Sequence, residues 1–102
     1  MNTANKEELQ RIFNKSPFIA DLGIIPESMG YGECVTVLVL EKRHLQQDGF
    51  VHAGVQATLA DHTAGAAAAT LIAEGQIVLT AEFKINFMRP AVGERFLAIG
   101  RD

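Results

Sequence analysis

Asp61 is the residue whose type and surroundings most clearly suggest chemistry in this sequence. It is the only charged residue between Ala53 and Ala73, a run made mostly of Ala, Leu, Thr, Ile and Val. Such a run predicts a helix buried nearly all round, where a carboxylate loses its hydration. The alternative to a chemical role is a buried Asp satisfied by hydrogen bonds from a neighbouring loop. We favour a role as nucleophile or as the base that activates water, because isolated carboxylates in apolar helices are uncommon.

The helix face that carries Asp61 is built from small residues, because positions three or four apart share a face. These residues are Gly54, Ala57, Thr58, Gly65 and Ala68. Another backbone or a ligand can therefore approach this face closely. The adjacent His62 points roughly 100° away around the helix at about 3.6 residues per turn. We expect His62 to be a core or interface residue rather than a catalytic partner of Asp61.

The start of the predicted helix offers a site for negative charge. Backbone N–H groups there are unpaired and the helix dipole favours an anion, so Ala53 and Gly54 could form an oxyanion site. Taken by itself, Gly54 is slightly better explained as a residue that lets the loop turn tightly into the helix. Gln46 could hold a carbonyl or a water through its amide, or be a solvated loop residue. For His52 we prefer a capping or loop-bridging role to a catalytic one.

The spacing of Ala53 and Asp61 has a geometric consequence. They are eight residues apart, so on one helix they are separated by about 12 Å. Two groups that act on one carbonyl must both lie within about 3–3.5 Å of it. If both are catalytic, the N–H groups come from one subunit and Asp61 from another, across a two-fold axis. The helix N-terminus of the partner would then also help to keep Asp61 ionised.

Composition indicates one soluble domain spanning residues 1–102. The formal net charge of −3 and the absence of a Lys/Arg cluster argue against a nucleic-acid binder. A single cysteine, Cys34, excludes an internal disulfide and fits a reducing compartment. The N-terminus lacks a secretion signal, and the Ala-rich helix is too polar for a membrane span, so we expect a cytosolic protein. The three histidines stand alone without metal-ligand spacing, and no cofactor is expected.

The N-terminal third predicts one helix and two strands. Residues 5–15 form an amphipathic pattern with Asn5 as cap and an apolar stripe of Leu9, Ile12 and Phe13. Ser16-Pro17 should end this helix, and residues 18–29 should be extended, with Pro26 marking an edge strand. After a turn at residues 30–32, residues 33–41 read as a strand covered on both faces, with Cys34 in the core.

The rest of the chain predicts the long helix followed by two more strands. Gly75 should end the helix as the residue after its C-cap. Residues 77–88 alternate apolar and polar side chains and give the clearest strand pattern in the sequence. After a turn at residues 89–93, the strand beginning at Glu94 continues to Asp102. The order of elements predicts an α+β fold with an antiparallel sheet of about four strands around one central helix.

Three parts of the sequence together resemble the hotdog-fold acyl-CoA thioesterases, closest to the phenylacetate-pathway and 4-hydroxybenzoyl-CoA thioesterase type. The loop HLQQDGFVHAG (44–54) is similar to the family's loop, and LAD (59–61) to its helix carboxylate. FKINFMRP (83–90) is similar to the following strand and its Arg-Pro turn. The resemblance runs from about Phe18 onward. It implies a hotdog fold in which an antiparallel sheet wraps one long helix, and hydrolysis of small acyl-CoA or aryl-CoA thioesters.

The resemblance also implies roles for individual residues. It makes Asp61 the nucleophile or general base, favours Ala53 and Gly54 as the oxyanion site, and adds Gln46 and His52 to the catalytic set. Cations that could meet the phosphates of coenzyme A are Lys84, Arg89 and Arg95, although scattered surface charge explains them as well. The expected assembly is a homodimer or tetramer with active sites shared between subunits.

The chain departs from the family pattern in two places. Ala53 replaces the first Gly of a pair, which is tolerable if its backbone N–H does the work. The family continues with two strands beyond the one that begins near Glu94, so we expect a C-terminally truncated form or one completed by its partners. Two other functions stay open at this point: a hotdog hydratase or dehydratase, and a non-catalytic module that binds acyl-CoA.

Overall fold

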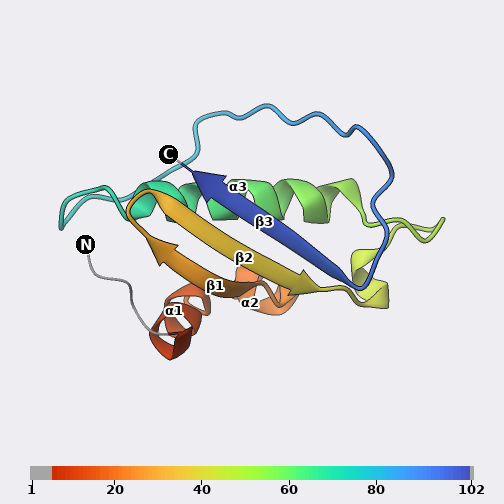
Figure 1. Cartoon of the computed structure of the whole chain (residues 1–102), viewed down its shortest axis with the longest axis horizontal. Helices are drawn as coiled ribbons and strands as arrows, with labels where there is room; N and C mark the ends of the chain where they lie inside the picture. Colours follow the sequence, from red (N-terminus) through yellow and green to blue (C-terminus); the bar gives the residue numbers. More distant parts are fainter. Residues whose placement is uncertain (1–5, 102) are drawn as a thin grey trace.

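A computed structural model describes residues 6–101 as three strands, three α-helices and one short 3-10 helix. Figure 1 shows the sheet lying against one long helix, with two short helices near its edge. The elements in chain order are α1 (Lys6–Phe13), α2 (Pro17–Leu22), β1 (Ile25–Gly30), β2 (Glu33–Val39), η1 (Lys42–His44), α3 (Ala53–Ala69) and β3 (Arg95–Arg101). No helix in this range is long and apolar enough to cross a membrane.

The sheet is antiparallel, with strands in the order β1-β2-β3. β1 and β2 form a hairpin whose turn places Tyr31 at φ 51° and Gly32 at φ 79°, the left-handed conformation that tight hairpin turns need. β1 lies at the edge, as Pro26 predicted, and its pairing shifts at a bulge between Pro26 and Ser28. β3 pairs with the other side of β2, with Val37 opposite Leu97.

The helix α3 packs on the face of the sheet formed by Cys34, Thr36 and Leu38, all almost fully buried. The hydroxyls of Thr36 and Thr63 are 2.6 Å apart and share a hydrogen bond in this layer. β3 approaches α3 so closely at Gly100 that a Cβ there would lie 2.9 Å from the carbonyl oxygen of Thr63. The close contact fixes α3, and with it Asp61, relative to the sheet.

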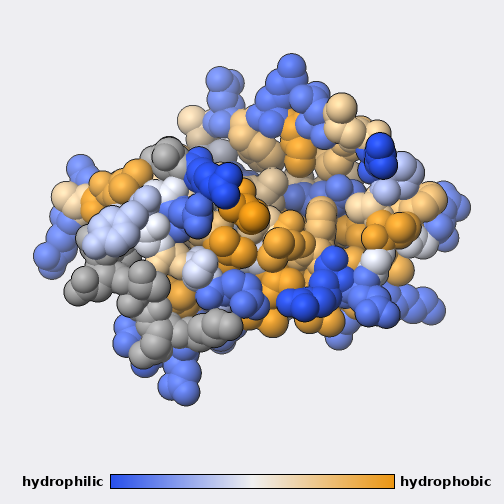
Figure 2. Space-filling model, in the orientation of Figure 1, coloured by the Kyte–Doolittle hydropathy of each residue, from blue (hydrophilic) through white to orange (hydrophobic). Residues whose placement is uncertain are grey.

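The outer face of the sheet is apolar and exposed. Figure 2 shows hydrophobic side chains gathered over the sheet, between charged groups at the rim. The exposed apolar residues on the strands include Ile25, Val39, Leu97 and Ile99. The expectation that β2 is covered on both faces holds at Val37, which is buried, but not at Val39, which is 53% exposed.

The region between α1 and β1 differs from the prediction. Residues 18–22, expected to be extended, belong to the helix α2, with Pro17 in its first turn and Gly23 after its end at φ 88°. Proline fits the first turn because its missing N–H has no helical partner there, and glycine accepts the left-handed C-terminal position at no steric cost. The same Pro17 that stops one helix therefore starts the next. Of the stripe predicted for α1, Leu9 and Phe13 are buried and Ile12 is half-exposed, while the Asn5 cap lies outside the described residues.

The end of α3 also differs from the prediction. The helix ends at Ala69 rather than near Gly75, with Thr70 as its C-cap. The Thr70 hydroxyl donates to the carbonyl of Ala67 (2.7 Å) and accepts from the N–H of Gly32 (2.6 Å). This buried hydroxyl ties the helix end to the β1–β2 turn, a contact between distant segments that local sequence does not reveal.

The prediction of a strand at residues 77–88 is wrong, because the structure has no helix or strand between α3 and β3. The sheet therefore has three strands instead of about four. In Figure 1 the segment is an unpaired trace that arcs past α3, apart from β3. A groove of about 500 Å³ separates residues 85–88 from β3, and α3 contributes Ala60 and Ala64 to it. A strand pattern becomes a strand only when a neighbour takes its hydrogen bonds, and no neighbour within residues 6–101 does so.

Candidate active site

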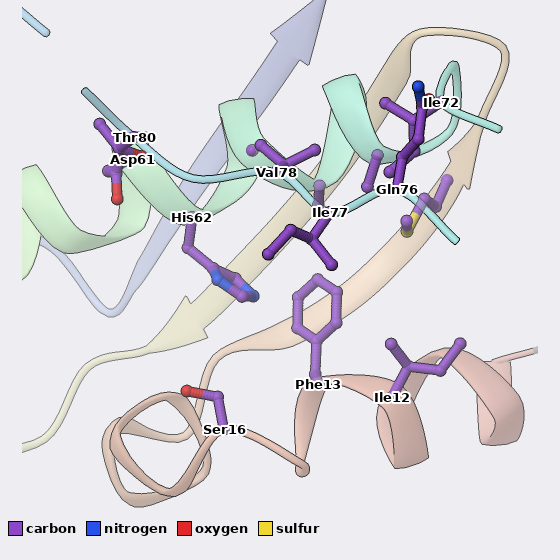
Figure 3. Close-up of a pocket in the computed structure, with 14 residues that line it drawn as sticks. Ile12, Phe13, Ser16, Asp61, His62, Ile72, Gln76, Ile77, Val78 and Thr80 are labelled. Atoms are coloured by element: carbon purple, nitrogen blue, oxygen red, sulfur yellow. The ribbon is translucent and has the colours of Figure 1, made fainter. Parts of the chain in front are cut away.

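Asp61 lies in the middle of α3, half-buried, and is paired with a residue from the next segment of the chain. The hydroxyl of Thr80 donates a hydrogen bond of 2.7 Å to Oδ1 of Asp61. Figure 3 shows the two side chains facing each other, one from the helix and one from the extended segment. A hydroxyl donor stabilises the charged form of a carboxylate and fixes the direction of its oxygens. The alternating pattern of residues 77–88 makes Thr80 one of the polar positions, but the sequence analysis predicted no functional role for it.

A cavity of about 440 Å³ opens beside Asp61, bounded by α1, α3 and residues 76–80. Its apolar walls are formed by Ile12, Phe13, Met29, Ala66, Ala69, Ile72, Ile77 and Val78. Asp61, His62 and Thr80 supply polar groups (Figure 3). A concave, mainly apolar space with a few polar groups is the usual form of a small-molecule site. This cavity can take an apolar group whose reactive end lies at Asp61.

His62 lies in the wall of the same cavity. Its ring meets the ring of Phe13 edge to face, with centroids 4.6 Å apart (Figure 3). Burial lowers the pKa of His62 below 6.5, and the charge of Asp61 offsets this only in part. Its Nε2 is buried without a hydrogen-bond partner among the described residues. A neutral imidazole packed on Phe13 agrees with the expected core position and not with a base paired to Asp61.

The N-terminus of α3 is capped by His52, whose Nδ1 accepts the N–H of Gly54 at 2.8 Å. The N–H groups of Val55 and Gln56 donate to the carbonyl of His52. Of the first helical N–H groups, that of Ala53 therefore has no acceptor within residues 6–101. The geometry leaves Ala53, rather than Gly54, as the free donor for a negatively charged oxygen.

The loop before α3 is anchored by His44, which is 1% exposed. Its Nδ1 accepts the N–H of Glu41, and its Nε2 lies 2.9 Å from the carbonyl oxygen of Leu22. Because Nδ1 is an acceptor, Nε2 carries the proton and donates to Leu22. The carbonyl of His44 in turn accepts the N–H of His52. These bonds set the position at which the helix begins.

A second cavity, of about 510 Å³, lies at this end of α3 and brings together four of the predicted site residues. Gln46, His52, Ala53 and Arg89 all line it. The Oε1 atom of Gln46 accepts the N–H of Asp48, so its amide NH₂ group remains the end that can meet a ligand. Lys84 and Arg95 are exposed side chains outside this cavity.

Five of the predicted site residues thus fall into two groups at the two cavities, while Gly54, Lys84 and Arg95 line neither. Asp61 belongs to the first cavity, and Ala53, Gln46, His52 and Arg89 to the second. Because Ala53–Ala69 is one continuous α-helix, Ala53 and Asp61 are about 12 Å apart along its axis. One chain does not bring the free N–H and the carboxylate to the same atom.

Other chemistry is weakly represented in the described residues. Burial raises the pKa of the Cys34 thiol to about 11, so this core cysteine stays protonated at neutral pH. Within residues 6–101 no group of three His, Cys, Asp or Glu side chains is arranged to hold a metal ion. Asp61 is therefore the group on which the candidate chemistry depends.

Comparison with known protein families identifies the fold that holds this site. The profile of the thioesterase superfamily matches residues 48–101, which include the loop before α3, the whole helix and β3. The chain belongs to the thioesterase superfamily. It is an enzyme of the thioester hydrolase class with a hotdog fold, as the residues of the loop, helix and following segment predicted.

Several solved structures, some of them named as thioesterases, are similar over most of the chain. A thioesterase family protein from Silicibacter pomeroyi is 36% identical, with a TM-score of 0.84 over 91% of this chain and 68% of that one. A thioesterase from Haemophilus influenzae is 24% identical (TM-score 0.84; 96% and 68% of the two chains). The PaaI protein of the Escherichia coli phenylacetic acid degradation operon is 21% identical (TM-score 0.76; 91% and 66%). The last two show the shared fold. No curated protein matches the sequence.

Proposed function

We propose that this thioesterase hydrolyses small acyl-CoA or aryl-CoA thioesters to the free acid and coenzyme A. The observation that carries the proposal is the Asp61 carboxylate, held by Thr80 at the edge of an apolar cavity. The carbonyl carbon of the thioester lies at Asp61 and the acyl group enters the cavity. The apolar walls then remove water from the acyl group. Asp61, the only carboxylate among the residues that line the cavity, faces the bond that reacts.

Asp61 acts in one of two ways that use the same geometry. As a base, it takes a proton from a water whose oxygen attacks the carbonyl carbon, and the C–S bond then breaks to release the thiol. As a nucleophile, its oxygen attacks the carbonyl, the thiol leaves, and water hydrolyses the resulting anhydride. Thr80 occupies Oδ1 in either case, so Oδ2 is the oxygen turned to the substrate.

The oxyanion site comes from a second copy of the chain. The free N–H of Ala53 in the partner subunit points at the carbonyl oxygen, and the Gln46 amide of that subunit supports it. The separation of about 12 Å along α3 supports this division between two chains. The small-residue face around Asp61 gives the partner helix room to approach. The functional unit is a homodimer or a tetramer with shared sites.

Coenzyme A lies on the side of the second cavity. Arg89 borders that cavity, and Lys84 and Arg95 are exposed cations that the phosphates of coenzyme A can recruit. The reaction uses carboxylate, amide and backbone groups only, so we propose no metal or cofactor. We further propose that the chain works as a single hotdog domain in the cytosol.

A thiol-release assay tests the proposal. Purified protein is given acetyl-, hexanoyl-, benzoyl- and phenylacetyl-CoA, and free coenzyme A is detected with a thiol reagent. Asp61→Asn removes the charge but keeps the shape, and should lower kcat by roughly 10²–10⁴-fold. Asp21→Asn, at an exposed carboxylate on α2, is the matched control and should have no effect. Full turnover by folded Asp61→Asn protein would contradict the role of Asp61.

A further inference from the structure

The cavity beside Asp61 has a gap in its wall at a position where the sequence could have placed a side chain. Gly65 lies four residues after Asp61, on the same face of α3, and lines the cavity. A Cβ built at Gly65 meets no atom within 4 Å. Nothing in the fold of a single chain therefore requires a glycine at this position, although glycine inside a helix is less stable than alanine.

We propose that Gly65 determines which acyl groups the enzyme accepts, by leaving open the part of the cavity that the first carbons beyond the carbonyl must enter. This inference rests on the proposed function. An acyl carbonyl placed at Asp61 directs the rest of the acyl group along α3 past Gly65. The next turn of the helix presents Ala69, about 6 Å further along the axis, which is again small.

The opposite wall of the cavity is bulky and apolar, which defines the space that remains. Phe13 of α1, with Ile77 and Val78 of the extended segment, lines the cavity across from the helix (Figure 3). An acyl group can lie between this wall and α3 only if the helix leaves room for it at position 65. A side chain at position 65 would project into the same space. We therefore assign the cavity to acyl groups with bulk close to the carbonyl, such as a phenylacetyl group.

The neighbouring residue on another face of α3 does not line the cavity beside Asp61. Ala64, the preceding residue, is exposed and borders the groove beside β3 instead of the cavity. Changing Ala64 to valine adds two carbons to the same turn of the helix, against three in Gly65→Val, without entering the acyl cavity. Ala64→Val is thus a matched control for Gly65→Val.

The experiment measures kcat/KM for acetyl-CoA and phenylacetyl-CoA in the wild type, Gly65→Ala, Gly65→Val and Ala64→Val. The ratio of kcat/KM for phenylacetyl-CoA to kcat/KM for acetyl-CoA should fall by about tenfold or more in Gly65→Val and by less in Gly65→Ala. Valine adds three carbons and alanine one, and a single methylene in an apolar pocket can discriminate by about tenfold. The ratio should not change in Ala64→Val. If Gly65→Val does not fold, the Gly65→Ala ratio decides, because alanine suits a helix better than glycine.

Three outcomes would overturn the inference. An unchanged substrate ratio in folded Gly65 variants would remove Gly65 from specificity while leaving the thioesterase proposal intact. Equal loss of activity on both substrates, with dissociation of subunits seen by light scattering, would make Gly65 a subunit-packing residue instead. Absence of turnover by the wild type on every thioester would refute the proposed function itself, and the inference with it.

Discussion

The hydroxyl of Thr80 lies 2.7 Å from the Asp61 carboxylate and joins two segments that are nineteen residues apart. The helix alone does not orient this carboxylate, because its side chain has no bulky neighbour on its own face. The segment after α3 supplies the orienting donor, although it is not paired into the sheet. The position of residues 77–88 therefore decides how Asp61 is oriented, even without strand hydrogen bonds.

Thr80→Val should lower kcat by about 10- to 100-fold, because a hydrogen bond to a charged group contributes about 1.5–3 kcal/mol and each 1.36 kcal/mol is a factor of ten. Thr80→Ser keeps the hydroxyl and should retain most activity. Steady-state kinetics on the best substrate of the panel checks both variants. Equal activity of the valine and serine variants would show that the Thr80 hydroxyl has no part in the reaction.

Ala53→Pro should remove the free N–H without unfolding α3. Ala53 is the first helical residue, where proline is favoured, and His52 before it has φ −59° and ψ 135°, the extended conformation that precedes proline. Loss of one oxyanion donor should lower kcat by about 10²–10³-fold. Circular dichroism should show unchanged helix content. Wild-type kcat in this variant would exclude Ala53 from the oxyanion site.

Mixing Ala53→Pro chains with Asp61→Ala chains should restore activity, because one of the two sites in a mixed dimer regains both halves. Refolding the two variants together and measuring turnover against each variant alone tests this expectation. Light scattering should show a dimer or larger assembly at low micromolar concentration. Mixed dimers without recovered activity, or a stable monomer that is fully active, would contradict a site shared between chains.

Gly100→Ala should destabilise the protein by about 1–3 kcal/mol, the usual result of adding a methyl group to a full core. The added Cβ would lie 2.9 Å from the Thr63 carbonyl, and both backbones are held by the sheet and the helix. Gly65→Ala is the matched control and should stabilise α3 instead. Urea unfolding measures both changes, and equal stability of the Gly100 variant and the wild type would show that β3 can move away from α3.

His62 should make stability depend on pH in the acidic range. Burial lowers its pKa in the folded state, so the unfolded chain binds more protons between that pKa and 6.5. The free energy of unfolding is then fully present above pH 6.5 and falls as the pH drops toward the folded pKa. His62→Phe should flatten this fall, whereas His52→Asn, which keeps a capping side chain, should not. Identical pH profiles for the wild type and His62→Phe, from urea unfolding at pH 5–7, would contradict this assignment.

The sequence determined the parts of the molecule that depend on local pattern. The apolar run around Asp61 predicted α3, and the shorter apolar run at residues 33–41 predicted β2, because the length of a run and its bounding turns distinguish these elements without a partner. Pro26 placed β1 at the edge, since proline has no N–H to donate to a second neighbour. The spacing of Ala53 and Asp61 was enough to predict that one chain cannot bring the Ala53 N–H and the Asp61 carboxylate to the same atom, because helix geometry fixes their distance along the axis.

Tertiary structure decided the features that require a distant partner. Thr70 ends α3 because its hydroxyl bonds to the turn at Gly32, and Thr80 orients Asp61 from another segment. His52 takes the N–H of Gly54 and leaves that of Ala53 free. Residues 77–88 have the strongest strand pattern in the sequence and still form no strand, because alternation sets which face a side chain occupies but not which chain takes the hydrogen bonds.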